Sequence, residues 1–233
     1  MPFKQDWDGC KVYDSWVDGD VTWSIEDLAP EDDELAVELY VEHFLEDEIM
    51  CIRTGIAKTE AGRDGMRSFW RNCVADRTSL ACYRHHQGKR ELAAMNICSV
   101  KSIDMPPYDL SKIECKAIRT VVGVLAYVEE KVDVYKTLDV DTYLSGSGLL
   151  VLRQFRGHKL GAKVLNCREP MCRKLGIKGT ATLFSGAASQ KSAANCGFYD
   201  LLDISFLELD QIGFHIPGDQ THRVKLMAKK YFM

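Results

Sequence analysis

The segment that most constrains the fold runs from Leu149 to Ala162 and reads LLVLRQFRGHKLGA. An apolar run ends at Arg156-Gly157, a short turn follows, and a helix-like segment begins near Leu160. A strand, a turn and a helix in that order direct the free N–H groups of the first helical turn into one concavity. Together with the positive end of the helix dipole, these donors suit a pyrophosphate. The alternative is an ordinary strand-to-helix turn that happens to contain two glycines.

Size and composition describe a globular protein. The chain has 233 residues, which is enough to bury a sizeable core in one α/β domain, with 46% hydrophobic and 27% charged residues. No apolar run approaches the roughly 20 residues of a membrane span, and the first residues lack the regions of a secretory signal. The nine cysteines are scattered and form no Cys-x-x-Cys pair, which favours reduced filler residues over a zinc site. We therefore expect a cytoplasmic protein with no membrane partner and no metal.

The net charge of −4 hides an asymmetry between two segments. Residues 1–50 contain sixteen acidic side chains against Lys4 and Lys11, whereas residues 151–191 contain nine basic side chains against Glu169 alone. Solvated charged faces would explain each segment separately. Together, the segments suggest an anionic ligand on one side and a cationic ligand on the other. Nucleic acid is not expected as a partner, because the whole chain is acidic and aromatic residues do not alternate with the bases.

Apolar patterning and turn residues predict about seven strands and four or five helices, alternating as in a mixed sheet with helices on both faces. The predicted strands cover residues 22–28, 79–84, 91–99, 149–155, 179–184, 199–208 and 222–229. The predicted helices cover residues 30–44, 62–74, 111–132, 160–175 and 189–196. We expect a turn at Ser145–Gly148, a helix cap at Ser111, and a kink or break near Asn166 to Pro170. One domain is predicted over residues 1–233, with residues 1–20 as an N-terminal extension.

Several short motifs, taken in order, resemble the GNAT acetyltransferases. Residues 156–162, RGHKLGA, resemble the acyl-CoA pyrophosphate loop of that superfamily. Residues 185–189, followed by Asn195–Phe198, resemble its last strand, short helix and closing Gly-Phe. The resemblance implies a single GNAT-type α/β domain.

A narrower resemblance is to the insect arylalkylamine (dopamine-type) N-acetyltransferases. It rests on Pro30–Asp32 followed by Phe44 and Asp47-Glu48, and on Val128–Glu130 and Val224–Lys229. The matched region spans roughly residues 25–229. The order and spacing of these motifs make the resemblance more specific than any one of them.

The resemblance implies acetyl-CoA as co-substrate, with no metal required. The residues expected to bind it are Leu149, Leu150, Val151, Arg156, Gly157, His158, Lys159, Leu160, Gly161 and Ala162. The first three would present backbone donors to the tetrahedral oxyanion. Lys159 departs from the family pattern, which has glycine there so that the backbone approaches the phosphates without a Cβ. Lys159 would either crowd the pyrophosphate or supply an ammonium group to it.

Acyl transfer to an amine also requires a base, because an alkylammonium has a pKa of about 10. By the resemblance, Glu31 is the general base; the alternative is an acid that only complements the helix dipole. Ser185 and Ser189 match two serines of the insect subfamily and are expected to be catalytic or to organise the substrate. Ser189 is also placed to cap a short helix. The leaving thiolate needs a proton donor, and many GNAT enzymes have a tyrosine for this near the position where this chain has Asn195. His222 is expected to be a surface residue or to face the amine pocket.

The sequence thus predicts an acetyl-CoA-dependent N-acetyltransferase that acts, as a monomer, on the primary amine of an arylalkylamine or a related small amine by direct attack. A polyamine- or agmatine-type N-acetyltransferase is one alternative, since the acidic N-terminal segment would suit several positive charges. A catalytically degenerate CoA-binding module is another, which Lys159 favours. Tyr40, Phe44 and Trp70 are expected to pack in the core, with stacking on an aryl ring as the alternative.

Overall fold

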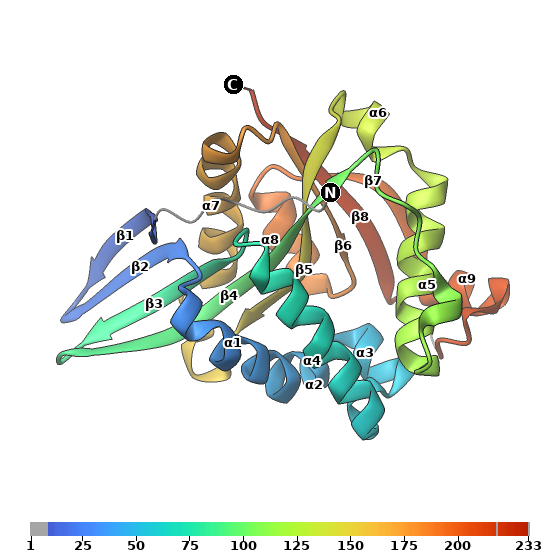
Figure 1. The fold of residues 1–233 in the computed structure, drawn as a ribbon, viewed down its shortest axis with the longest axis horizontal. Helices are drawn as coiled ribbons and strands as arrows, with labels where there is room; N and C mark the ends of the chain where they lie inside the picture. The colour runs from blue at the N-terminus through green and yellow to red at the C-terminus, as the bar shows by residue number, and fades with distance from the viewer. Residues whose placement is uncertain (1–8, 218, 233) are drawn as a thin grey trace.

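One mixed sheet of eight strands organises the computed structural model, which describes residues 9–217 and 219–232 (Figure 1). The strand order is β1-β2-β3-β4-β5-β6-β8-β7. The strands are β1 Val12–Asp18, β2 Val21–Asp27, β3 Leu80–His86, β4 Lys89–Ser102, β5 Thr142–Val151, β6 Gly179–Phe184, β7 Tyr199–Ser205 and β8 Arg223–Lys230. Neighbouring strands are antiparallel except β5 and β6, which are parallel.

Helices connect the strands and cover both faces of the sheet (Figure 1). The helices are α1 Asp33–Leu39, α2 Leu45–Asp47, α3 Ile49–Thr54, α4 Glu60–Ala75, α5 Lys116–Lys131, α6 Val134–Leu138, α7 Leu160–Leu175, α8 Ala187–Asn195 and α9 Phe206–Leu209. A π-helical segment, Tyr40–Phe44, joins α1 to α2. None of the helices in the described part of the chain is both long and apolar enough to cross a bilayer.

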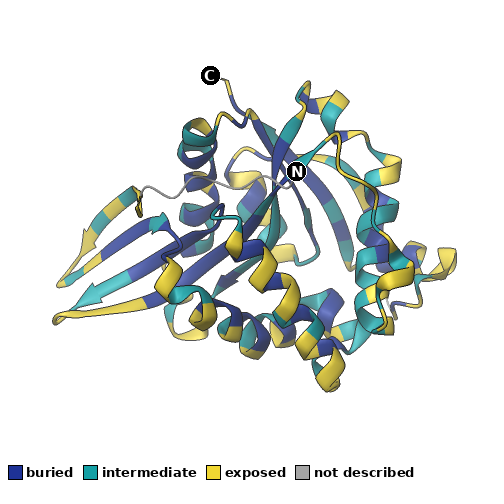
Figure 2. Cartoon of the chain, in the orientation of Figure 1, coloured by how far each residue is buried: buried dark blue, intermediate teal, exposed yellow. Residues whose placement is uncertain are grey.

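The core follows from the two-residue alternation of the central strands. On β3, Ala81 and Tyr83 pack on the side of α1 and α4, whereas Leu80 and Cys82 pack on the side of α7. Farther along the sheet, apolar residues of α5 and of α8 join two further clusters with β6 and β8. Figure 2 shows the buried residues concentrated on the central strands and on the inner sides of the helices. The predicted mixed sheet with helices on both faces is confirmed.

The sheet has eight strands, one more than the predicted number of about seven. The additional strand, β1, lies in the expected N-terminal extension and pairs with β2 at the edge of the sheet. Its residues are exposed or half-buried, so an edge strand here lacks the apolar alternation that marks the central strands. Residues 1–8 of the expected extension lie outside the described residues.

The prediction of a turn at Ser145–Gly148 was wrong, because these residues lie inside β5. Strand β5 is held from both sides, by β4 along most of its length and by β6 near its middle. A bulge absorbs the glycine-rich stretch, with a register shift opposite Asn96 to Cys98. Pairing across the sheet overrides the local turn preference of Ser and Gly.

Three smaller expectations also differ from the structure. Helix α5 begins at Lys116, and the single turn before it is capped by Asp109, so Ser111 is not the helix cap. Helix α7 continues through Pro170 without a break. Gly186 is the N-cap of α8, so Ser189 lies inside this helix and does not cap it. In contrast, the bounds predicted for α7 and β6 are confirmed.

Candidate active site

The parallel strands β5 and β6 form a fork in the sheet. Their pairing is limited to Leu144 with Thr180 and Ser145 with Ala181. Beyond this point β5 continues to Val151, hydrogen-bonded to β4 on its other side. Alternate backbone groups of the last residues of β5 therefore point toward β6 without a strand partner on that side.

The bulge of β5 at the fork is fixed by aromatic side chains from the helical layer. The Tyr40 hydroxyl lies 3.0 Å from the carbonyl oxygen of Gly148 and accepts from the Ile97 N–H at 3.2 Å. Gly148 has φ +142, and a Cβ there would lie 2.5 Å from Tyr40 Cε1, so no larger residue fits. Trp70 Nε1 donates to the Ser147 carbonyl at 3.0 Å. Tyr40 and Trp70 are fully buried, which confirms that they belong to the core, while Phe44 is partly buried beside them.

The N-terminus of α7 lies against the end of β5. The first helical hydrogen bond runs from the Lys163 N–H to the Lys159 carbonyl at 3.2 Å, so the N–H groups of residues 160–162 point out of the helix end. A Cβ on Gly161 would lie 3.7 Å from both Leu149 and Val151, which shows how closely the helix approaches the strand. Lys159 is the N-cap and adopts the left-handed conformation, with φ 58 and ψ 22. The glycine of the family pattern is therefore replaced by a lysine that keeps a glycine-like backbone.

Asp47 at the end of α2 connects the N-terminal helices to the loop before α7. Its carboxylate accepts from Arg153 Nη2 at 2.7 Å and from Arg156 Nη2. Arg156 Nε also donates to the Val151 carbonyl at 3.1 Å. Burial raises the pKa of Asp47, but the two guanidinium groups outweigh this effect and hold the pKa below its usual value. Arg156 is thus placed beside the end of β5.

Glu48 is the carboxylate that the structure brings to Ser185, one of the two expected serines. It is the N-cap of α3, and Glu48 Oε2 accepts from the Cys51 N–H at 2.7 Å. Ser185, directly after β6, donates its hydroxyl to Glu48 Oε1. Ser189 lies one turn into α8, where its hydroxyl donates to the Gly186 carbonyl at 2.8 Å. Sequence reasoning noted Asp47-Glu48 as a motif but assigned no role to Glu48.

Glu31 lies elsewhere. It is exposed in the single 3₁₀ turn Pro30–Asp32, before α1. It follows β2 closely in the chain, and the end of β2 pairs with the start of β1 through Val12 and Glu26. The structure does not bring Glu31 to Ser185 or Ser189.

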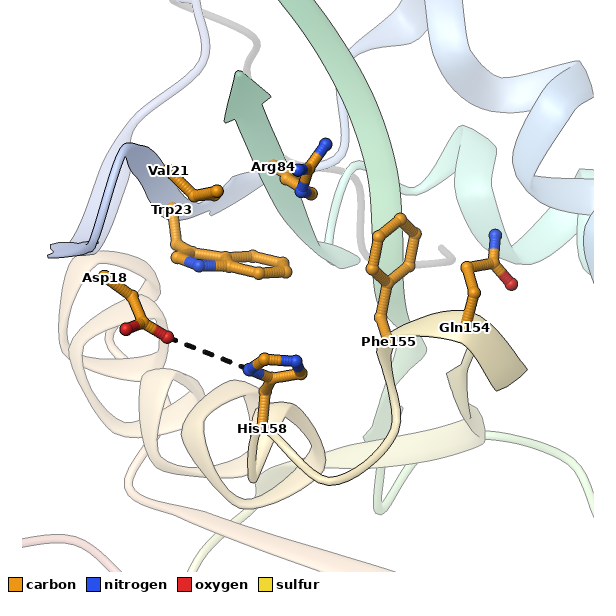
Figure 3. Close-up of a pocket in the computed structure, with 7 residues that line it drawn as sticks. All are labelled: Asp18, Val21, Trp23, Arg84, Gln154, Phe155 and His158. Atoms are coloured by element: carbon orange, nitrogen blue, oxygen red, sulfur yellow. Dashed lines mark ion pairs between the residues drawn. The ribbon is translucent and has the colours of Figure 1, made fainter.

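His158 of the expected phosphate loop turns away from the fork. Its Nδ1 lies 3.8 Å from an Asp18 carboxylate oxygen, and its ring centroid lies 5.7 Å from that of Trp23 (Figure 3). These residues line a hollow of about 390 Å³ together with Val21, Arg84, Gln154 and Phe155. The hollow lies between the loop and strands β2 and β3, on the other side of the loop from β6.

Several acids of the N-terminal segment are paired with arginines. Asp33, Glu34 and Glu38 form ion pairs with arginines in or just after α4, namely Arg77, Arg71 and Arg67. His222, at the start of β8, is exposed and lies 2.9 Å from Asp219. No group of three or more potential metal ligands converges among residues 9–217 and 219–232.

Comparisons with known proteins support the fold and the family expected from the sequence. No protein-family model and no curated protein sequence matches the chain. A solved structure described as the insect putative arylalkylamine N-acetyltransferase 7, from the mosquito Aedes aegypti, is 26% identical, covers 98% of this chain and 99% of that chain, and has a TM-score of 0.90. Arylalkylamine N-acetyltransferase 2 of Aedes aegypti is 20% identical, with coverages of 90% and 99% and a TM-score of 0.80.

Other similar structures have different substrates in their names. The polyamine N-acetyltransferase of Drosophila melanogaster, which forms N-acetylagmatine, is 18% identical, with coverages of 89% and 99% and a TM-score of 0.75. More distant structures, both 12% identical, contain acetyl-CoA. The chain is thus a GNAT-fold protein whose structural neighbours are insect arylalkylamine N-acetyltransferases, in agreement with the family expected from its sequence.

Proposed function

We propose that this chain is an acetyl-CoA-dependent N-acetyltransferase that acts on the primary amine of an arylalkylamine or a related small amine. The observation that carries the proposal is that β5 and β6 part and lead to two groups of different chemistry. Because the two strands are parallel, their C-terminal ends lie on the same side of the fork. One end leads to the helix N-terminus of α7, which suits a pyrophosphate, and the other leads to the Ser185–Glu48 pair.

Acetyl-CoA would lie along the fork. The N–H groups of Leu160, Gly161 and Ala162 would bind the pyrophosphate, with Gly157, His158 and Lys159 forming the turn before them. Within the stretch Leu149–Val151, the N–H groups that face away from β4 would meet the thioester carbonyl. Arg156, exposed and held by Asp47, would add positive charge beside the phosphates.

Glu48 is the stronger candidate for the general base. In the proposed reaction Glu48 removes a proton from the alkylammonium, directly or through one water, and the nitrogen lone pair then attacks the thioester carbonyl carbon. A C–N bond forms while the carbonyl π electrons move to oxygen. Attack leaves the nitrogen positively charged. Collapse of this intermediate re-forms the carbonyl and breaks the C–S bond, and sulfur leaves with the electron pair and takes up the proton that the nitrogen gives up. The proton held by Glu48 is released to solvent. Ser185 would hold the carboxylate in place, and Ser189 would organise the substrate one helical turn away.

The charges around the site favour a monoamine over a polyamine. Asp33, Glu34, Glu38 and Asp47 already pair with arginines, so these four carboxylates offer little free negative charge to a second or third ammonium group. Phe44, partly buried and next to the bulge of β5, offers an apolar wall for an aryl ring. We further propose that residues 1–233 act as one domain, as a monomer and in the cytosol, where nine free thiols remain reduced.

Acetyl-CoA should stabilise the chain against heat, whereas NADH and ATP should not. At about 100 times its dissociation constant, a ligand adds roughly 2.7 kcal/mol to the free energy of unfolding. The measurement is a thermal unfolding scan with each ligand, followed by an assay of free CoA thiol with a phenylalkylamine and with a polyamine. An unchanged melting temperature at millimolar acetyl-CoA would contradict the enzyme assignment and favour the degenerate module.

Glu48→Gln and Glu31→Gln distinguish the two candidate bases. Both substitutions keep the shape of the side chain and remove its charge, and in Glu48→Gln the new amide oxygen can still accept from the Cys51 N–H. We expect Glu48→Gln to lower kcat/KM for the amine by about 10²-fold or more, the usual scale for a lost general base. Glu31→Gln should stay close to wild type. The loss should shrink as the pH approaches the pKa of the amine.

Steady-state kinetics of both variants at neutral and alkaline pH check this assignment. Melting temperatures equal to that of the wild type serve as the folding control. The reverse ranking, with Glu31→Gln the impaired variant, would restore the assignment made from the sequence.

Lys159→Gly should raise the free energy of unfolding by up to about 1 kcal/mol. A left-handed conformation costs a residue with a Cβ roughly 1–2 kcal/mol, and the greater freedom of glycine in the unfolded chain offsets about half of this gain. The matched control is Lys191→Gly, in the right-handed helix α8, which should lower the free energy of unfolding by about 1 kcal/mol. Urea unfolding measures both. If the free energy of unfolding fell by the same amount in both variants, Lys159 would not be in the left-handed conformation.

A further inference from the structure

Arg168 on α7 is the largest charged side chain buried in the core, with 0% exposure. Its Nε donates to Asn96 Oδ1 at 2.7 Å. Its Nη1 lies 3.0 Å from Thr180 Oγ1 and 2.8 Å from Thr182 Oγ1. All three acceptors are neutral, so these hydrogen bonds satisfy donors of the guanidinium without cancelling its charge.

The acid next to Arg168 along the chain does not neutralise it. Glu169 pairs instead with Arg173 at 2.9 Å and with Lys229 at 3.4 Å. A buried charge without an opposite charge is costly, and an apolar side chain of similar length would pack α7 on the sheet at lower cost. The charge also acts on its neighbours: burial raises the pKa of the Cys98 thiol, and Arg168 opposes that rise.

Arg168 lies where β5 and β6 part. Thr182 Oγ1, which accepts from Arg168, also accepts from the Gly146 N–H at 3.0 Å and so joins the two strands at the fork. A Cβ on Gly146 would lie 2.3 Å from Arg168 Nη2, so the missing side chain of this glycine makes room for the guanidinium. Asn96, the other partner of Arg168, donates through Nδ2 to the Gly148 carbonyl at 2.5 Å. The guanidinium is thus tied to both sides of the fork and to the bulge of β5.

We propose that Arg168 is a positioning residue for acyl transfer, which holds the fork and the β5 bulge in register and supplies positive potential to the acyl carbonyl bound there. The inference rests on the proposed function. It acts through Asn96 and Thr182, which bond to Gly148 and Gly146 in the bulge directly before Leu149. In a buried site of low polarity, a fixed positive charge favours the negative charge that develops on the carbonyl oxygen.

The test uses three variants of the full chain. Arg168→Met keeps the length and removes the charge, Arg168→Gln keeps hydrogen-bond donors without the charge, and Arg168→Lys keeps the charge. We expect kcat to fall about 10²-fold in the Met and Gln variants, the scale of a lost oxyanion donor, with the KM for acetyl-CoA within threefold of wild type. The kcat of Arg168→Lys should be at least tenfold higher than the kcat of the Met and Gln variants. Arg119→Met, an exposed arginine of α5 that donates to backbone carbonyls, is the matched control and should retain wild-type kcat.

A second readout does not depend on turnover. The infrared carbonyl frequency of bound acetyl-CoA, labelled with ¹³C in the acetyl group, should be lower on the wild-type chain than on Arg168→Gln. Equal frequencies on the two proteins would overturn the role of Arg168 while leaving the proposed function intact. A wild-type chain that does not bind acetyl-CoA would overturn both. If Arg168→Met does not fold, the Gln and Lys variants are compared instead. Equal kcat in these two variants would show that the charge of Arg168 does not contribute to acyl transfer.

Discussion

The parting of β5 from β6 is the constraint on which the rest of the site depends. Two parallel residue pairs join these strands, and a bulge then carries β5 away. The bulge persists because buried polar groups are bonded to its carbonyls: the Tyr40 hydroxyl and the Asn96 amide at Gly148, and the Trp70 indole at Ser147. Leaving such groups unpaired in the core costs about 1–3 kcal/mol each. The opening therefore belongs to the folded core and is not a loose edge of the sheet.

The same arrangement explains which parts of the fold could be predicted from sequence. Helix α7 and strand β6 have complete local signals, an apolar pattern with a glycine at the end of the helix, and their bounds agree with the structure. The stretch Ser145–Gly148 carries the opposite local signal. It is a strand only because β4 and β6 supply hydrogen bonds from residues far away in the chain, and because Tyr40 occupies the space that a side chain at Gly148 would need.

The site shows a similar division. Ser185 and the segment 149–162 lie on contiguous motifs, so sequence alone was enough to single them out. The contact of Ser185 with Glu48 joins residues 137 positions apart. Asp47-Glu48 is part of a motif, but no local pattern shows which acid meets Ser185. The buried state of Arg168 was equally invisible, because it is one of nine bases in a segment that looks like a charged surface. Burial and long-range contacts are properties of the fold, and they determine which charged side chains lie at the fork and which remain on the surface.

The two candidate carboxylates lie in different surroundings. Glu48 lies at the end of β6 and is held by two donors, whereas Glu31 is exposed near the edge strand β1. The central claim is that CoA and the amine meet at the fork in front of Glu48. The most direct measurement is a crystal structure of the chain with a conjugate of CoA and an arylalkylamine. We expect the pyrophosphate about 3 Å from the N–H groups of Gly161 and Ala162, with the former amine nitrogen within one water of Glu48. A conjugate bound in the hollow beside Trp23, or with its nitrogen nearer to Glu31, would contradict it.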